Sequence, residues 1–153
     1  ASRGMSVLII SRTREKLIAE TENIKKHAAA AGQTVEVDYL AYDFTNAAGA
    51  DAFYAALKEK TDVMDKDGGI GALINNVGIA NEVPEYMFML DDTWTYNILR
   101  VNIDGTVRMT RAILPYMAGR CDRPPCNPLI SIARAPCCSC SFTSLCNMYV
   151  CRR

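Results

Sequence analysis

Residues 72–78 read Ala-Leu-Ile-Asn-Asn-Val-Gly, an apolar run that ends in two amides and a glycine. Such a run is stable as a strand when both of its faces are covered, as in a parallel sheet sandwiched by helices. Amides and a glycine at its carboxyl end place hydrogen-bonding groups and bare backbone where open α/β sheets bind ligands. An ordinary Asn/Gly turn would give the same pattern, and this alternative stays open at this point.

Short apolar runs alternate with helical patterns along most of the chain. The expected strands are 6–10, 35–39, 70–74 and 128–132, and apolar positions at helical spacing fall in 17–28, 50–64 and 94–113. The run at 35–39 alternates apolar and polar residues, which is typical of a strand near a sheet edge. Strands that alternate with helices predict β-α-β units with right-handed crossovers, and therefore a layered α/β fold with a parallel sheet.

The composition is that of one globular domain. The chain has 153 residues, half of them hydrophobic, and a formal net charge of zero. Nothing in this charge balance favours a nucleic acid as partner. After Ile132 the periodic pattern ends, so we expect a domain over 1–132 and an irregular Cys- and Arg-rich tail over 133–153. That tail is either a flexible extension or a translation of the wrong reading frame or an intron, and we favour the latter.

Seven cysteines all lie at or after Cys121, and an odd number crowded at one end makes a poor disulfide framework. Cys137 and Cys140 have CxxC spacing, with Cys146 and Cys151 following, and four thiolates can hold a zinc ion. The short spacers and the lack of a histidine argue against zinc, so we expect no metal site.

Basic residues follow the first expected strand. Arg12 and Arg14 lie at the start of a helix, with Lys16 one turn on. Positive side chains at this end oppose the helix dipole by roughly 0.3–1 kcal/mol each. A bound anion would relieve the conflict, and an arginine suits a phosphate in a bidentate fork. The alternative is a solvated charged face, with Glu15 and Glu20 as screening neighbours.

Two further positions combine polar groups with apolar neighbours. Asp43 and Phe44 follow the second strand, at the same expected edge as Arg12. A carboxylate there can accept from an adenine amino group, or it can cap the next helix. Asn102 lies within the long helical pattern, where its amide competes with the hydrogen bonds of the helix. It therefore points to solvent or distorts the helix locally.

Together these residues resemble the short-chain dehydrogenase/reductase family over about 1–132. Residues 75–78 are similar to the family's Asn-Asn-Ala-Gly motif, and 101–106 to its helix motif with the catalytic Asn. Residues 10–17, 43–44 and 84–86 resemble one subgroup, the very-long-chain 3-oxoacyl-CoA reductases and related 17-beta-hydroxysteroid dehydrogenases.

The resemblance implies a Rossmann-type three-layer fold that binds NADP(H) and transfers hydride between the nicotinamide and a carbonyl. Arg12 would hold the 2′-phosphate, Asp43 and Phe44 would flank the adenine, and Asn102 would support catalysis. The remaining cofactor contacts would be Asn75, Asn76, Val77, Gly78 and Val101. The implied substrate is a ketone such as a 3-oxoacyl-CoA or a steroid, in lipid metabolism and fatty acid elongation. The subgroup further implies the endoplasmic reticulum membrane and a homodimer through the helix after Asp91.

Two departures from the family bear on this chain. The glycine-rich turn and the first central strand would precede Ala1, so we expect a partial fold in which 6–10 and 70–74 either close on each other or leave a gap. Such a gap exposes unpaired backbone groups, and we expect the chain alone to be unstable, not to bind NADPH and to be inactive. The nearest match to the catalytic Tyr-x-x-x-Lys is Tyr149 with Arg153. The alternative function is a non-catalytic Rossmann-like binding or interaction module.

Overall fold

The computed structural model describes residues 1–66, 68–81, 83–118, 129–132 and 148–152. The strands are β1 (Ser6–Ser11), β2 (Val37–Ala41), β3 (Ile70–Asn75), β4 (Leu129–Ile132) and β5 (Met148–Arg152). The helices are α1 (Arg14–Ala30), α2 (Ala50–Lys66), η1 (Met87–Met89), α3 (Asp92–Leu99), η2 (Arg100–Gly105) and α4 (Thr106–Ala118). In this part of the chain the strands form one sheet in the order β2-β1-β5-β3-β4.

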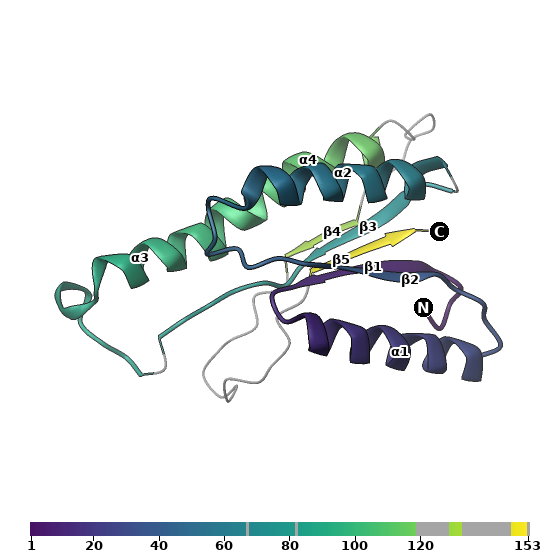
Figure 1. Ribbon diagram of the computed structural model, residues 1–153, viewed down its shortest axis with the longest axis horizontal. Coiled ribbons are helices and arrows are strands. Elements are labelled where there is room, and N and C mark those ends of the chain that lie inside the picture. The colour runs from purple at the N-terminus through teal and green to yellow at the C-terminus, as the bar shows by residue number, and fades with distance from the viewer. Residues whose placement is uncertain (67, 82, 119–128, 133–147, 153) are drawn as a thin grey trace.

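Helices cover both faces of this sheet, which confirms the layered α/β fold (Figure 1). The side chains of β1 alternate between the two faces of the sheet, so each face of this strand packs against one layer of helices. Leu8 and Ile10 pack in the core cluster shared with α2 and α4. Val7 and Ile9 face the other way and pack with Leu17 of α1. Because successive side chains of a strand point to opposite faces, a continuous apolar run is what this doubly covered strand requires.

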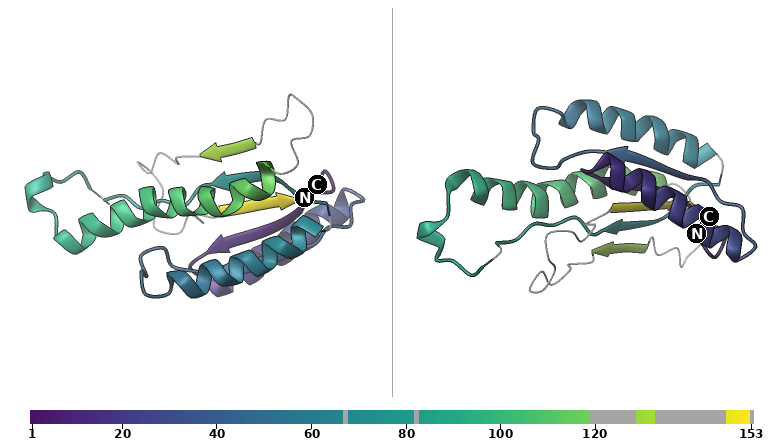
Figure 2. Two further views of the ribbon diagram at one scale, coloured as in Figure 1. Left: turned by 90° about the horizontal axis from the view of Figure 1, so that it is seen from above. Right: turned by 60° about the horizontal axis from the view of Figure 1, so that its bottom comes forward.

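The two arrangements expected for β1 and β3 are both wrong, because the strands neither pair with each other nor leave a gap: β5 lies between them. β1 pairs with β2 in parallel and β3 pairs with β4 in parallel, while β5 lies between β1 and β3 and runs antiparallel to both. Figure 2 shows the β5 arrow pointing against the arrows of β1, β3 and β4. The sheet is therefore mixed rather than parallel. The physical reason is that the facing edges of β1 and β3 offer unpaired N–H and C=O groups, which an apolar segment of the same chain satisfies.

The tail expected as irregular thus contributes a central strand at residues 148–152. Residues 133–147, which include Cys137, Cys140 and Cys146, lie outside the described part of the chain. The CxxC alternative therefore stays a prediction that the structure does not address. Cys151 of β5 is a free, buried thiol.

The long helix predicted over 94–113 is interrupted. It consists of α3, a π-helical segment η2 and α4, and α3 continues beyond the end of the sheet (Figure 2). Asn102 lies in η2, so the alternative of a local distortion of the helix at this residue agrees with the structure, although the residue is also exposed. π-Helical turns inside α-helices are rare and frequently occur at functional sites.

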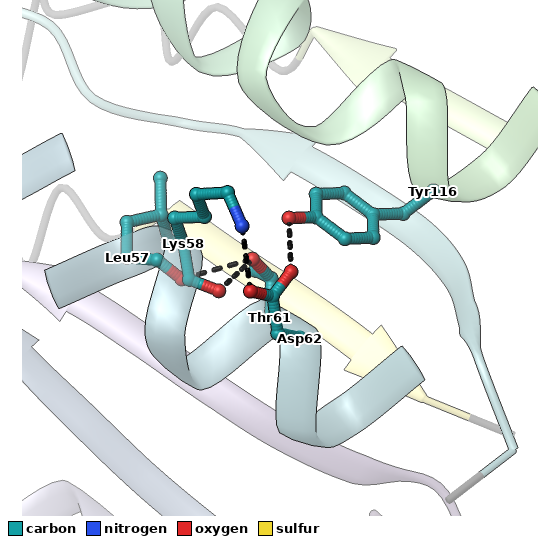
Figure 3. A network of polar contacts seen from close by, with 5 residues as sticks. All are labelled: Leu57, Lys58, Thr61, Asp62 and Tyr116. Atoms are coloured by element: carbon teal, nitrogen blue, oxygen red, sulfur yellow. Dashed lines mark hydrogen bonds and ion pairs between the residues drawn. The ribbon is translucent and has the colours of Figure 1, made fainter. Parts of the chain in front are cut away.

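Polar contacts connect α4 to α2, and both helices cover the same face of the sheet (Figure 3). The Tyr116 hydroxyl donates to Asp62 Oδ1 at 2.6 Å, and Lys58 Nζ donates to Asp62 Oδ2 at 2.7 Å. The hydrogen bond from Lys58 is the main cause that lowers the pKa of the Asp62 carboxyl. Within α2, Thr61 Oγ1 donates to the Leu57 carbonyl at 2.9 Å. These contacts set the position of α4, and with it that of η2, over the sheet.

Candidate functional site

The candidate residues gather at one edge of the sheet because β1, β2 and β3 run in the same direction and end there. Arg12 follows β1, Asp43 comes two residues after β2, and Asn76 follows β3. The Tyr42 N–H donates to the Ser11 carbonyl at 2.9 Å, which ties the turn after β2 to the end of β1. The carboxyl edge of such a sheet is where α/β proteins bind ligands.

The segment after β3 is held by Asn102. Asn102 Nδ2 donates to the Ile79 carbonyl at 2.8 Å, and the Ile79 N–H donates to Asn102 Oδ1 at 2.8 Å. A Cβ on Gly78 would lie 3.2 Å from the same Oδ1, so the glycine allows the close approach. Both polar atoms of the exposed Asn102 amide therefore bond to the Ile79 backbone at the point where the helix is π-helical.

Asn75 is almost fully buried, with 3% of its surface exposed. Its Nδ2 donates to Thr110 Oγ1 on α4 at 3.1 Å. Its Oδ1 is buried and has no hydrogen-bond partner among the described residues. A buried acceptor left unpaired costs about 1–3 kcal/mol, so this oxygen is an acceptor available to a donor group. Thr110 is not among the site residues that the sequence predicts. It lies about two helical turns after Asn102, so Thr110 and Asn102 share the side of α4 and η2 that faces β3.

Arg12 is exposed at the entrance to α1. Thr13 takes the N-cap position, but its side chain makes no capping hydrogen bond. The first N–H groups of α1 therefore lack a side-chain cap. A cationic side chain beside an uncapped helix start is an arrangement that suits an anion.

Asp43 closes a local turn. Its Oδ1 accepts from the Thr45 N–H at 2.9 Å and from Thr45 Oγ1 at 2.8 Å. Because α2 begins only at Ala50, Asp43 is not the N-cap of that helix, which removes the capping alternative. Arg100 donates to the Thr45 carbonyl at 3.0 Å, which ties this turn to η2.

Phe44 and Val101 are apolar cofactor contacts of the prediction, and both are buried in the core, 6% and 3% exposed. The Phe44 ring packs edge-to-face against Phe53, and a Cβ on Gly105 would lie 2.9 Å from it. The Phe44 and Val101 side chains therefore pack beneath the carboxyl edge of the sheet and do not face solvent. Val77 and Gly78 are partly exposed at the mouth itself.

A cavity of about 670 Å³ lies behind this edge, between α2 and the α3–η2–α4 segment. Its lining residues include Tyr42, Phe44, Tyr54, Arg100 and Arg108. Burial raises the pKa of the Tyr54 hydroxyl, so this phenol stays protonated at neutral pH. Arg12 and Asn76 do not line this cavity. The structure thus brings the predicted residues to one edge of the sheet, and of the predicted cofactor contacts only Phe44 lines this cavity.

Tyr149 lies in β5, where its backbone pairs with Ile9 and Ile74. The expected pairing of this tyrosine with a basic residue four positions later requires helical spacing, since residues i and i+4 are neighbours on a helix. Met148–Arg152 is a strand, so the local geometry does not support that pairing. The described residues bring no three His, Cys, Asp or Glu side chains together as a metal site.

We expect the substitution Asn102→Ala to destabilise the fold by about 1–2 kcal/mol, because both bonds to Ile79 are lost and each contributes of order 1 kcal/mol. Urea unfolding measures this free energy. The matched control is Asn97→Ala, an asparagine of α3. Alanine favours a helix intrinsically, so the control is expected to be neutral or slightly stabilising. Equal stabilities for the two variants would contradict the role assigned to Asn102.

Comparison with known proteins gives a consistent result. The family model for the short chain dehydrogenases matches residues 1–123. The hydroxysteroid dehydrogenase-like protein 1 of Gallus gallus is 32% identical over 138 residues, which are 90% of this chain and 37% of that protein. The very-long-chain 3-oxoacyl-CoA reductase of Mus musculus is 31% identical over 122 residues, 78% of this chain and 35% of that protein.

Two further relatives extend this comparison. The 17-beta-hydroxysteroid dehydrogenase type 3 of Danio rerio is 33% identical over 140 residues, 90% of this chain and 41% of that protein. A solved short-chain dehydrogenase/reductase from Burkholderia xenovorans superposes with a TM-score of 0.58 at 25% identity, covering 78% of this chain and 45% of that one. The chain therefore spans well under half of the length of the proteins it matches.

Proposed function

Because this chain belongs to the short-chain dehydrogenase family, we propose that it supplies cofactor-binding residues of an NADP(H)-dependent oxidoreductase that reduces a ketone by hydride transfer. The observation that carries the proposal is the shared carboxyl edge, where Arg12 follows β1 and the Asn102–Ile79 contact holds the segment after β3. The nicotinamide supplies the hydride when the cofactor is bound. The chain's own residues position and hold the nucleotide.

The choice of NADP(H) over NAD(H) rests on Arg12. An acidic residue after this strand would suit a ribose diol, whereas an arginine suits a ribose phosphate. Arg12 is exposed beside the uncapped start of α1, so both the guanidinium and the helix end favour an anion. The buried, unpartnered Asn75 Oδ1 is available to a donor at the same edge. These residues fit the adenosine half of the cofactor, with Asp43, Asn76, Val77 and Gly78 around it.

For the substrate we propose a ketone such as a 3-oxoacyl-CoA or a steroid, which would place the protein in lipid metabolism and fatty acid elongation. The support is similarity to proteins named very-long-chain 3-oxoacyl-CoA reductase and 17-beta-hydroxysteroid dehydrogenase type 3. We extend the proposal to a site of action at the endoplasmic reticulum membrane. Among the described residues, none of the helices combines the length and hydrophobicity needed to cross a bilayer.

For catalysis we propose that Asn102 is a positioning residue and that this polypeptide by itself does not turn over. Tyr149 lies in a strand and lacks the helical spacing to a basic partner. A second candidate function, a non-catalytic binding module, is favoured by relatives whose names call them inactive. The protein named inactive hydroxysteroid dehydrogenase-like protein 1 of Homo sapiens is 31% identical over 138 residues.

The test combines binding and turnover. Loss of cofactor binding was expected because the edges of β1 and β3 would be unpaired. β5 pairs with both strands, so this reason no longer applies. We expect NADPH to raise the melting temperature of the chain more than NADH does, with no ketone-dependent oxidation of NADPH by a 3-oxoacyl-CoA or a steroid ketone. Equal shifts with both cofactors would contradict the NADP(H) assignment. Ketone-dependent oxidation would show that the chain is itself an active reductase.

We further propose a homodimer through an apolar stripe on α3, η2 and α4. The stripe consists of exposed side chains at helical spacing, namely Tyr96, Leu99, Ile103, Val107 and Leu114. Ile103 lies near its centre with 55% of its surface exposed. In a twofold dimer each stripe would cover the other, which removes apolar surface from water.

The substitution Ile103→Asp is expected to convert the dimer to a monomer, because two carboxylates would be buried in one interface. Sedimentation velocity measures the change in mass. Val63→Asp is the matched control, since Val63 on α2 is 56% exposed and outside the stripe. A wild-type protein that stays monomeric at all concentrations, or an Ile103→Asp protein that stays dimeric, would contradict this interface.

A further inference from the structure

The cavity between α2 and the α3–η2–α4 segment opens near the start of α2. Its volume of about 670 Å³ is within the range of small-molecule sites. Tyr116 and Asp62 join α4 to α2 toward the other end of α2 (Figure 3). Ala50 and Tyr54, in the first two turns of α2, line the open part. The two helices are therefore connected at one end and leave room for a ligand at the other.

Most of the cavity lining is apolar. Phe44, which is almost fully buried, lines it on the side of the core. An apolar row consists of side chains spaced four residues apart that line the same cavity and are each about half exposed, namely Leu99, Ile103 and Val107. The row is about 12 Å long at the helical rise, which is about the length of a ten-carbon chain. An aliphatic chain along the row would remove these side chains from water.

Two hydrogen-bond donors line the cavity close to each other. Burial raises the pKa of the Tyr54 hydroxyl and the nearby Arg108 charge lowers it in part, so the phenol stays protonated and can donate. Arg108 Nε donates to Asp104 Oδ1 at 3.0 Å. This contact engages only Nε, so the terminal nitrogens of the guanidinium can donate to a ligand. Tyr54 and Arg108 can therefore hold one anionic group together.

The charges of the lining favour a ligand with a single negative charge. The charged residues that line the cavity are Arg100, Asp104 and Arg108, which leaves one positive charge in excess. Arg100 already donates to the Thr45 carbonyl at 3.0 Å. A phosphate monoester carries about two negative charges, which exceeds this balance. A carboxylate carries one charge and matches the planar donors of a guanidinium.

We propose that this cavity binds an aliphatic carboxylate, held at its head by Arg108 and Tyr54 and along its chain by the apolar row. The site goes beyond the proposed function, because Arg12 and Asn76 of the carboxyl edge do not line the cavity. The apolar row belongs to the stripe proposed for the dimer, whereas Arg108 and Tyr54 do not. The contacts of the head can therefore be tested without changing the dimer surface.

The probe is decanoate, titrated into the full chain by calorimetry below its micelle concentration. We expect saturable binding of one decanoate per chain. Decanol keeps the chain and lacks the charge, so it should bind roughly tenfold more weakly or less tightly still, as the loss of hydrogen bonds to a charged group requires. Decyltrimethylammonium, with the same chain and a positive head, should not compete with decanoate.

The variant Arg108→Ala is expected to lower the affinity for decanoate by about tenfold or more, because the charged donors at the head are lost. Its fold should persist, since the ion pair with Asp104 joins two exposed side chains. Arg111→Ala is the matched control. Arg111 is also an exposed arginine of α4, but it does not line the cavity, so this variant should bind like the wild type.

Tyr54→Phe keeps the ring and removes the hydroxyl, so it should weaken decanoate binding by about threefold and leave decanol binding unchanged. Three results would overturn the proposal. The first is the absence of saturable decanoate binding. The second is equal affinity for decanol and decanoate, which would show adsorption to apolar surface alone. The third is an equal loss in Arg108→Ala and Arg111→Ala, which would show a general effect of positive charge.

Discussion

The Val150→Asp variant is expected to lose its cooperative thermal transition. Val150 is 0% exposed and packs with Leu8 and Leu73 at the centre of the sheet. A carboxylate placed there is buried without a partner, at a cost of several kcal/mol. Domains of this size are stable by about 5–15 kcal/mol in total, so this one change removes most of the available stability. Circular dichroism during heating measures the transition.

Val63→Asp is the control for the added charge. Val63 lies on α2 with 56% of its surface exposed, so its replacement should change stability by less than about 0.5 kcal/mol. If Val150→Asp melted like Val63→Asp, β5 would not be seated between β1 and β3.

The Arg12→Ala variant is expected to lose most of its affinity for NADPH and to keep its affinity for NADH. A hydrogen bond to a charged group contributes about 1.5–3 kcal/mol, which corresponds to a fall in affinity of roughly tenfold to a hundredfold. NADH lacks the 2′-phosphate, so its binding should not depend on Arg12. Titration calorimetry with each cofactor measures both affinities.

Arg14→Ala is the matched control for Arg12→Ala. Arg14 is also exposed and begins α1, so its removal changes the charge of the helix start by the same amount. A specific contact with the phosphate predicts a much larger loss for Arg12→Ala than for Arg14→Ala. Equal losses would show that the helix start attracts the cofactor only through its general positive charge.

Much of the fold could be predicted because apolar residues follow one another differently along strands and along helices. The apolar runs at β1 and β3 and the helical spacing of α1 and α2 identify a layered sheet without any long-range information. The distortion at Asn102 could also be predicted, since an asparagine within a helix competes for its hydrogen bonds. Its partner could not, because Ile79 contributes only backbone atoms and these carry no sequence signal.

β5 could not be predicted, since its own residues carry too little information. Its two described side chains, Val150 and Cys151, pack toward opposite layers, and the five-residue segment also includes an arginine. What places them in the sheet is the pair of open edges on β1 and β3, which is a property of other segments. Tyr149 is the nearest match to the catalytic tyrosine of the family motif, but its backbone lies in a central strand.

The most direct test of the central claim follows Arg12 and Asn76 together during a titration with 2′,5′-ADP, by nuclear magnetic resonance of the arginine Nε–H and asparagine Nδ2 groups. If the carboxyl edge is one site for a phosphorylated adenosine, both signals should shift along the same binding curve, and 5′-ADP should bind more weakly. Movement of Arg12 alone, or two curves with different dissociation constants, would contradict the claim that the two residues share a ligand.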